Sequence, residues 1–212
     1  MIKRSQIIEV IKENKIIAIV RGVEAITAIN IAETLYSGGV KLIEVTFNTP
    51  GAAEMIAVIK KAMEGKMYVG SGTVLDSETA KTAIDSGAEF ILSPSLDEGM
   101  ISTCNRYGKV AIPGIATPTE AVKAMQLGAD LIKLFPAAEL GHHYLKSIKG
   151  PLDHIEIIAV GGINLDNAKI FIDAGAIALG IGSSLVDKKL VAVADFQTIE
   201  KRAKLFVQSI LQ

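Results

Sequence analysis

Lys133, in the run DLIKLFP, is the residue whose type and surroundings point most directly to chemistry. Apolar residues flank it on both sides, which is typical of a position near the end of a buried strand. Burial disfavours the ammonium form and lowers the pKa of a lysine, so that more of the neutral amine is available to attack a ketone. The motif predicts a Schiff-base nucleophile; the alternative is a strand-end lysine whose stem reaches solvent.

Two further charged residues sit in apolar runs. Glu44, in KLIEVTF, shares one face of a strand with Leu42 and Thr46 and is expected to point inward. An inward carboxylate can act as a general acid/base, or hold water beside the lysine, and its alternative role is a buried ion pair. Arg21 ends the run IIAIVR, where its planar guanidinium can bind a substrate carboxylate or form a surface salt bridge.

Two glycine-rich segments follow the last apolar runs of the chain, AVGGIN at 159–164 and LGIGSSL at 179–185. Glycine lets the backbone approach an anion closely, and a helix N-terminus adds a favourable dipole. In barrels of alternating strands and helices, this position is a frequent phosphate site. We therefore predict a phosphate site here, with simple tight turns as the alternative.

The elements that must position these residues are eight short apolar runs. Runs rich in β-branched residues and without alternation suit parallel strands buried on both faces. Between them lie segments in which apolar residues recur every three or four positions, as in crossover helices. The runs are IIAIVR, KLIEVTF, MYVGSG, EFILS, KVAIPG, LIKLF, EIIAVGG and AIALGIG, beginning near residues 16, 41, 67, 89, 109, 131, 156 and 177.

Several of the helical segments end on glycine, where a left-handed C-cap favours that residue. These glycines are Gly38 with Gly39, Gly87, Gly128 and Gly175. Eight such units after a leading helix near residues 3–14 predict an α/β fold, a (β/α)8 TIM barrel with an extra N-terminal helix, and an open doubly wound sheet is the alternative. Active groups of such barrels gather at the carboxyl ends of the strands, where Lys133 and Arg21 fall.

Composition limits the class of protein. The 212 residues show no linker or shift in composition, so one domain over 1–212 is expected. The net charge of −1, without blocks of like charge, argues against nucleic-acid or membrane-surface partners, and no apolar run reaches the length of a membrane span. The single cysteine, Cys104, and the absence of a signal-peptide pattern or zinc-ligand spacing favour a cytoplasmic protein without metal or cofactor.

Seven segments, in order and with similar spacing, resemble the class I aldolase family acting on 2-keto-3-deoxy-6-phosphogluconate and 4-hydroxy-2-oxoglutarate. The resemblance covers almost the whole chain. The segments are LIEVTFNTP, VGSGTVLD, FILSPSLDE, PGIATPTEA, IKLFPAAELG, GGINLDN and GIGSSL.

The resemblance implies that Lys133 forms an imine with pyruvate or the keto acid, that Glu44 is the general acid/base, and that Thr73 and Arg21 hold the pyruvate carboxylate. It also implies a homotrimer and no cofactor. Pro94 and Phe135 would shape the pyruvyl pocket, and Gly161, Gly162, Gly182, Ser183 and Ser184 would receive a phosphate.

Two positions depart from the pattern of the phosphogluconate branch. Asn48 stands where many members carry an arginine, so Arg21 is expected to supply the missing cation. Val160 stands where that branch usually has threonine and the phosphogalactonate branch has valine. A missing hydroxyl removes one hydrogen bond to a substrate hydroxyl, so the configuration at C4 stays open.

The function expected is cleavage of 2-keto-3-deoxy-6-phosphogluconate to pyruvate and glyceraldehyde 3-phosphate, with cleavage of 4-hydroxy-2-oxoglutarate to pyruvate and glyoxylate as a second reaction. The first alternative is the same cleavage of 2-keto-3-deoxy-6-phosphogalactonate. More distant alternatives are a phosphate-binding barrel isomerase or epimerase and a non-catalytic sensor of sugar phosphates.

Overall fold

The computed structural model describes residues 3–211. Strands and helices alternate along the chain, and no helix in this range is long and apolar enough to cross a membrane. The strands are β1 (Ile16–Val20), β2 (Leu42–Thr46), β3 (Tyr68–Gly72), β4 (Phe90–Leu92), β5 (Val110–Ile112), β6 (Gly114–Ile115), β7 (Ile132–Leu134), β8 (Ile157–Val160) and β9 (Ala178–Ile181). The helices are α1 (Arg4–Asn14), α2 (Ala25–Ser37), α3 (Ala52–Ala62), α4 (Ser77–Asp85), α5 (Glu98–Arg106), α6 (Pro118–Gln126), α7 (Ala137–Leu140), α8 (His142–Lys149), α9 (Leu165–Asp173), α10 (Lys188–Ala192) and α11 (Phe196–Leu211).

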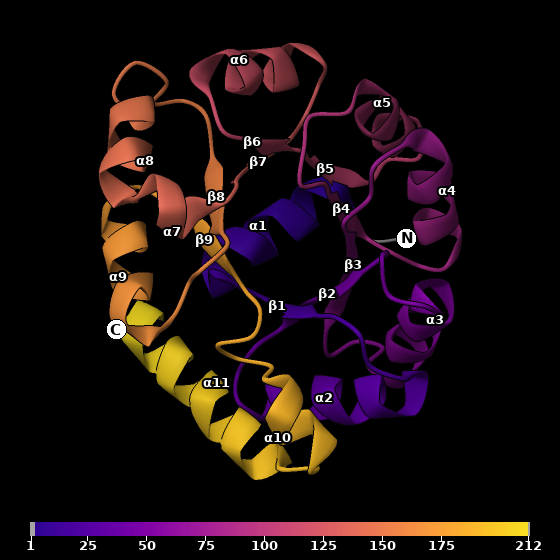
Figure 1. Ribbon diagram of the computed structural model, residues 1–212. Helices are drawn as coiled ribbons and strands as arrows, with labels where there is room; N and C mark the ends of the chain where they lie inside the picture. Colours follow the sequence, from indigo (N-terminus) through magenta and orange to yellow (C-terminus); the bar gives the residue numbers. More distant parts are fainter. Residues whose placement is uncertain (1–2, 212) are drawn as a thin grey trace.

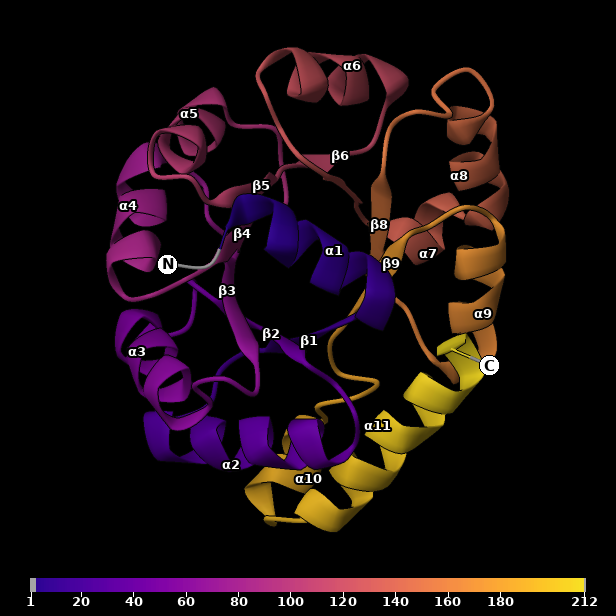
Figure 2. The same ribbon diagram turned by 180° about the vertical axis from the view of Figure 1, so that it is seen from behind.

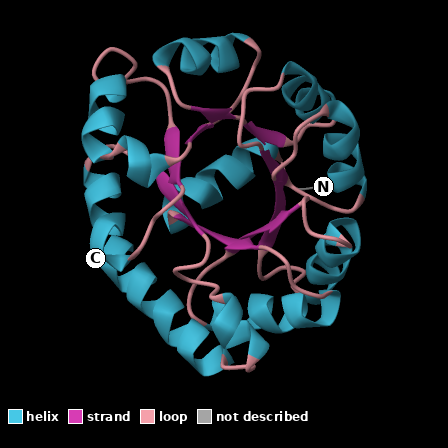
Figure 3. Ribbon diagram, in the orientation of Figure 1, coloured by secondary structure: helices cyan, strands magenta, loops and turns pink. Residues whose placement is uncertain are grey.

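The strands form a parallel barrel, as predicted. Each pairs with its neighbours in the order β5-β4-β3-β2-β1-β9-β8-β7-β6, and β1 pairs with β9, so the sheet is not an open doubly wound one. Figure 3 shows the strands as a ring inside the helices. The fifth predicted run is split at Pro113, so that β5 pairs with β4 and β6 pairs with β7. The ring closes through this residue, whose carbonyl accepts a hydrogen bond of 2.9 Å from the Lys133 N–H.

Helix α1, predicted near residues 3–14, crosses the amino-terminal end of the barrel, as Figure 2 shows. Ile7 and Ile11 on this helix are buried with inward residues of the strands, among them Phe90 and Ile158. A second and larger apolar cluster fills the layer between the strands and the surrounding helices. Apolar burial on both faces of the strands explains why their sequences lack alternation.

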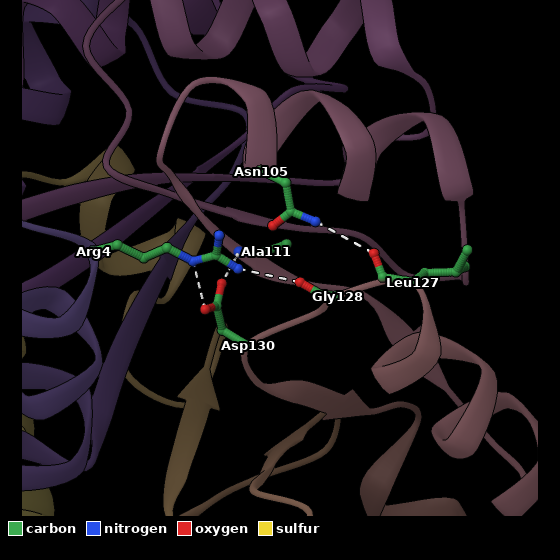
Figure 4. Close-up of polar contacts among 6 residues, drawn as sticks. All are labelled: Arg4, Asn105, Ala111, Leu127, Gly128 and Asp130. Atoms are coloured by element: carbon green, nitrogen blue, oxygen red, sulfur yellow. Dashed lines mark hydrogen bonds and ion pairs between the residues drawn. The ribbon is translucent and has the colours of Figure 1, made fainter.

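Polar contacts fasten α1 at this end of the barrel (Figure 4). The Arg4 Nε donates to the Asp130 Oδ1 at 2.5 Å, and an Arg4 Nη donates to the Gly128 carbonyl at 3.2 Å. The second oxygen of Asp130 accepts from the Ala111 N–H at 3.0 Å. The carboxylate of Asp130, in the turn that precedes β7, therefore contacts both α1 and the middle of β5.

The predicted glycine helix ends are confirmed with one exception. Gly39, Gly87, Gly128 and Gly175 all have positive φ angles. Gly38 is right-handed, with a φ of −80°. A Cβ there would overlap the Ala203 side chain of α11, so this glycine lets α2 and α11 pack closely.

Candidate active site

A pocket of about 540 Å³ opens at the carboxyl end of the barrel, the end that faces the viewer in Figure 1. Every candidate site residue from the sequence except Asn48 lines it. Those residues are Arg21, Glu44, Thr73, Pro94, Lys133, Phe135, Val160, Gly161, Gly162, Gly182, Ser183 and Ser184. The fold thus brings together side chains and loops from seven separate segments of the chain.

Lys133 lies in the middle of β7 and is 5% exposed, so the alternative of a lysine that reaches solvent is wrong. Its backbone is fixed on both sides, opposite Gly114 of β6 and Ile158 of β8. Burial lowers the pKa of the amine, the nearby Glu44 opposes that shift, and Arg21 adds to it. The Nζ lies 5.0 Å from the centre of the Phe135 ring. The pocket therefore holds an amine whose neutral form is favoured.

Glu44 lies on β2, also points into the barrel, and is 1% exposed. Its Oε2 has no hydrogen-bond partner among the described residues. Burial raises the pKa of this carboxyl, while the positive charges of Lys133 and Arg21 pull it back. The two pKa values shift toward each other, which suits a nucleophilic amine and a carboxyl that exchanges protons.

Two glycines of β3 make room for inward side chains of neighbouring strands. A Cβ at Gly72 would overlap the Glu44 Oε1, and a Cβ at Gly70 would overlap the Phe90 ring. Gly72 pairs with Thr46 and Gly70 pairs with Glu44 in the register of β2 and β3. The carboxylate of Glu44 therefore occupies space that only glycine at position 72 leaves free.

The wall beside β1 and β3 carries the candidate carboxylate ligands. Thr73 follows β3 and has a φ of 56°, a left-handed conformation that is costly for a β-branched residue and is often found at functional sites. Arg21 is exposed just after β1. The next residue, Gly22, donates its N–H to the Thr49 Oγ1 at 3.0 Å, which fixes the loop that carries Arg21.

Asn48 is exposed in the turn after β2 and does not belong to the residues that line the pocket. Its neighbour Thr49 is buried, and the Thr49 hydroxyl lies 3.1 Å from that of Thr46. Thr49, rather than Asn48, is therefore the buried polar residue of this turn. Sequence reasoning missed Thr49, since a threonine in a turn carries no distinctive signal.

The two glycine-rich segments form the adjoining wall, because β9, which precedes the second segment, pairs with β1. Within the described residues, the backbone N–H groups of five of their residues have no internal hydrogen-bond partner. The glycines are close to neighbouring chain: a Cβ at Gly161 would lie 3.2 Å from atoms of Phe135 and of Pro136. Free N–H groups at a pocket wall suit an anion. The five residues are Gly161, Gly162, Gly182, Ser183 and Ser184.

The helix N-termini expected at these loops are less directly involved. The side chain of Asn164 already accepts from the N–H groups of Asp166 and Asn167 at the start of α9. After β9 the chain makes one turn, in which the N–H groups of Leu185 and Val186 donate to the Gly182 carbonyl, and α10 begins only at Lys188. Loop N–H groups rather than helix dipoles therefore dominate this wall.

Three charged residues of the pocket wall were not anticipated from the sequence: Asp187, Lys188 and Lys189. They belong to the turn before α10 and to its first residues, in a segment that reads as an ordinary charged surface. No group of three or more His, Cys, Asp or Glu within residues 3–211 is arranged to hold a metal ion. The chemistry available to these residues is that of an amine, a carboxyl, a guanidinium and backbone N–H groups.

Known proteins with the same architecture include aldolases. The family model described as KDPG and KHG aldolase matches residues 7–202. The 2-dehydro-3-deoxy-phosphogluconate aldolase of Treponema pallidum is 32% identical over 91% of this chain and 92% of its own length. The 2-dehydro-3-deoxy-6-phosphogalactonate aldolase of Escherichia coli is 34% identical over 80% of this chain and 83% of its own.

A solved structure of the KDPG aldolase from Legionella pneumophila, with pyruvate captured at low pH as a covalent carbinolamine, superimposes with a TM-score of 0.87. It is 25% identical and covers 92% of this chain and 95% of its own. The family match spans both the lysine strand and the glycine-rich loops. The chain therefore belongs to the KDPG and KHG aldolase family and is a carbon–carbon lyase.

Proposed function

We propose that the protein cleaves a 2-keto-3-deoxy-6-phospho sugar acid to pyruvate and glyceraldehyde 3-phosphate, with Lys133 as the imine-forming residue. The observation that carries the proposal is the burial of an amine and a carboxyl, with opposite pKa shifts, in one pocket. The open wall of that pocket offers free N–H groups for a phosphate. A non-catalytic sensor has no need for such a pair, and a barrel isomerase has no need for a buried amine.

In the proposed reaction, the neutral Nζ of Lys133 attacks the C2 ketone and forms a carbinolamine. Glu44 supplies the proton with which the hydroxyl leaves as water, and a protonated imine results. Glu44 then accepts the proton of the C4 hydroxyl while the C3–C4 bond breaks. The electron pair of that bond enters the enamine, and the aldehyde leaves.

The enamine takes a proton at C3, and water then adds to the imine. Loss of pyruvate returns the amine of Lys133 to its neutral form. Arg21 and Thr73 bind the carboxylate throughout, which keeps C2 within reach of the amine. Each step needs only groups that line the pocket.

The preferred epimer at C4 is a finer part of the proposal. Val160 lines the pocket and is 3% exposed, so its side chain offers no hydrogen bond to a sugar hydroxyl. Because the phosphogalactonate branch carries valine at this position, the phosphogalactonate epimer is the second candidate substrate. Cleavage of 4-hydroxy-2-oxoglutarate to pyruvate and glyoxylate is proposed as a slower reaction, because that substrate leaves the N–H wall empty.

Borohydride reduction in the presence of pyruvate, followed by intact-mass spectrometry, tests the imine. The native protein is expected to gain one reduced pyruvyl group, and Lys133→Ala is expected to gain none and to lose turnover. Lys169→Ala, which removes an exposed lysine of α9, is the matched control and should behave as the native protein. An adduct on folded Lys133→Ala would assign the imine to another lysine.

The same preparation distinguishes the substrates. We expect kcat/KM to be highest for one of the two phosphorylated epimers and lower for 4-hydroxy-2-oxoglutarate. A higher value for 4-hydroxy-2-oxoglutarate than for either phosphosugar would overturn the phosphosugar assignment and leave the imine chemistry in place.

A further inference from the structure

The pocket wall assigned to the phosphate contains no charge of its own. Its five residues contribute only backbone N–H groups and two hydroxyls. A phosphate monoester carries a charge of about −1.5 to −2 near neutral pH. Neutral donors can hold such a group, and a nearby cation adds hydrogen bonds that are about twice as strong as those from neutral donors. The identity of that cation is not evident from the glycine-rich loops alone.

The mouth of the pocket supplies a candidate. Lys188, the first residue of α10, lines the pocket and extends toward the loop after β1. Its Nζ lies 3.1 Å from the place where a Cβ on Gly22 would be, next to Arg21. None of the ion pairs within residues 3–211 involves Lys188. Its charge is therefore available to a ligand.

The one carboxylate near this ammonium along the chain has other partners. Asp187 accepts from the Lys189 N–H at 2.8 Å, and its other oxygen lies 3.5 Å from the Arg202 guanidinium. The carboxylate thus caps α10 and pairs with α11. The Gly22 N–H donates to the Thr49 hydroxyl at 3.0 Å, which holds this glycine in place.

We propose that Lys188 binds the phosphate of the substrate from the mouth of the pocket and so determines the preference for phosphorylated keto acids. This role rests on the proposed function. It adds a cation from α10 to a site otherwise made of neutral groups, and it assigns Arg21 and Lys188 to different ends of the substrate. Arg21 serves the carboxylate and Lys188 serves the phosphate.

The test compares two substrates in Lys188→Ala, the preferred 6-phosphorylated sugar acid and 4-hydroxy-2-oxoglutarate. We expect kcat/KM for the phosphosugar to fall about 10- to 100-fold, mainly through KM, as for loss of one hydrogen bond to a charged group. The value for 4-hydroxy-2-oxoglutarate should change less than about twofold, within the range of ordinary surface substitutions. Lys188→Arg should restore most of the loss, and Lys169→Ala should show none.

Three other outcomes would contradict the proposal. An equal loss on both substrates, no loss on either, or a larger loss in Lys189→Ala would overturn the role of Lys188. Pyruvate trapping in Lys188→Ala keeps this result separate from the proposed function, since the imine should form as in the native protein. Absence of trapping in the native protein would instead refute the proposed imine chemistry.

Discussion

The two ends of the barrel differ in how they treat their charged groups. At the amino-terminal end, α1 fills the opening with Ile7 and Ile11, and both oxygens of Asp130 have donors. At the carboxyl end, Glu44 keeps an unpartnered oxygen and Lys133 is buried beside it. An unsatisfied buried polar group costs about 1–3 kcal/mol. The molecule therefore concentrates stabilising contacts at one end and tolerates reactive groups at the other.

The largest effect should come from the carboxyl end. Glu44→Gln keeps the size of the side chain and removes its proton exchange, so kcat should fall about 10²- to 10⁴-fold. Thermal stability should stay the same or rise, because the amide is cheaper to bury than the carboxylate. Steady-state kinetics and a melting curve measure both. A variant that kept more than half of the native kcat would remove Glu44 from proton transfer.

The glycines of β3 allow the two ends to be compared on one strand. Gly72→Ala pushes a methyl group into the Glu44 carboxylate, and Gly70→Ala pushes one into the Phe90 ring of the apolar interior. Both should lose about 1–3 kcal/mol of stability through overpacking. Only Gly72→Ala should also slow turnover of the folded fraction, by about tenfold or more, because only it displaces a catalytic group.

Urea unfolding together with kcat measures that pair of variants. If Gly70→Ala slowed folded enzyme as much as Gly72→Ala does, the separation between an apolar interior and a reactive end would be wrong. If neither slowed it, the space beside Gly72 would not determine where the carboxylate lies.

A smaller effect, on stability alone, is expected at the amino-terminal end. Asp130→Ala leaves the Arg4 Nε and the Ala111 N–H without their acceptor, although an Arg4 Nη keeps the Gly128 carbonyl. The free energy of unfolding should fall by about 2 kcal/mol, while kcat/KM of the folded protein should not change. Arg4→Ala should lose less, since it leaves the Ala111 N–H paired. A fall in kcat/KM at full folding would show that the two ends are coupled.

The smallest effect concerns pH. The pKa of Glu44 is raised by burial above its ordinary value of 4.5, so above pH 4.5 the folded chain holds a proton that the unfolded chain has released. The contribution of Glu44 to the free energy of unfolding is therefore fully present below pH 4.5 and is lost as pH rises through the raised pKa. For one proton, the loss is at most about 1.4 kcal/mol per pH unit.

Urea unfolding of the native protein and of Glu44→Gln over that pH range measures this loss. The free energy of unfolding of the variant should increase relative to that of the native protein as pH rises. Lys133 has the opposite effect at higher pH, because its pKa is lowered. Below its lowered pKa this amine reduces the free energy of unfolding, and that loss is recovered as pH rises toward 10.5. A constant difference between native protein and variant would mean that the Glu44 pKa is not shifted.

Much of this arrangement was predictable from sequence because it depends on local patterns. The apolar runs gave the strands, the terminal glycines gave most helix ends, and Lys133 and Glu44 stood out as charges inside apolar runs. The role of Asn48 was not predictable in this way. Period and spacing indicate which face of a strand a residue takes, but in the turn after β2 they do not distinguish Asn48 from Thr49.

Contacts between distant segments were beyond the reach of sequence reasoning. Nothing in VGSGT indicates that Gly72 makes room for a carboxylate of the preceding strand. Nothing in VDKK indicates that Lys188 approaches a glycine that follows β1. Pro113 was visible, but the division of one run between two partner strands depends on how the ring closes.

The pairing of β1 with β9 has a consequence for how the protein is made. It joins Ile16 to Leu179, so the ring can close only after most of the chain has been synthesised. Until then the edge of β1 lacks its partner, and contacts this distant in sequence are formed slowly. The pocket mouth lies across the same seam, since Arg21 follows β1 and Gly182 follows β9. During translation the substrate-binding wall is therefore among the last parts of the molecule to be assembled.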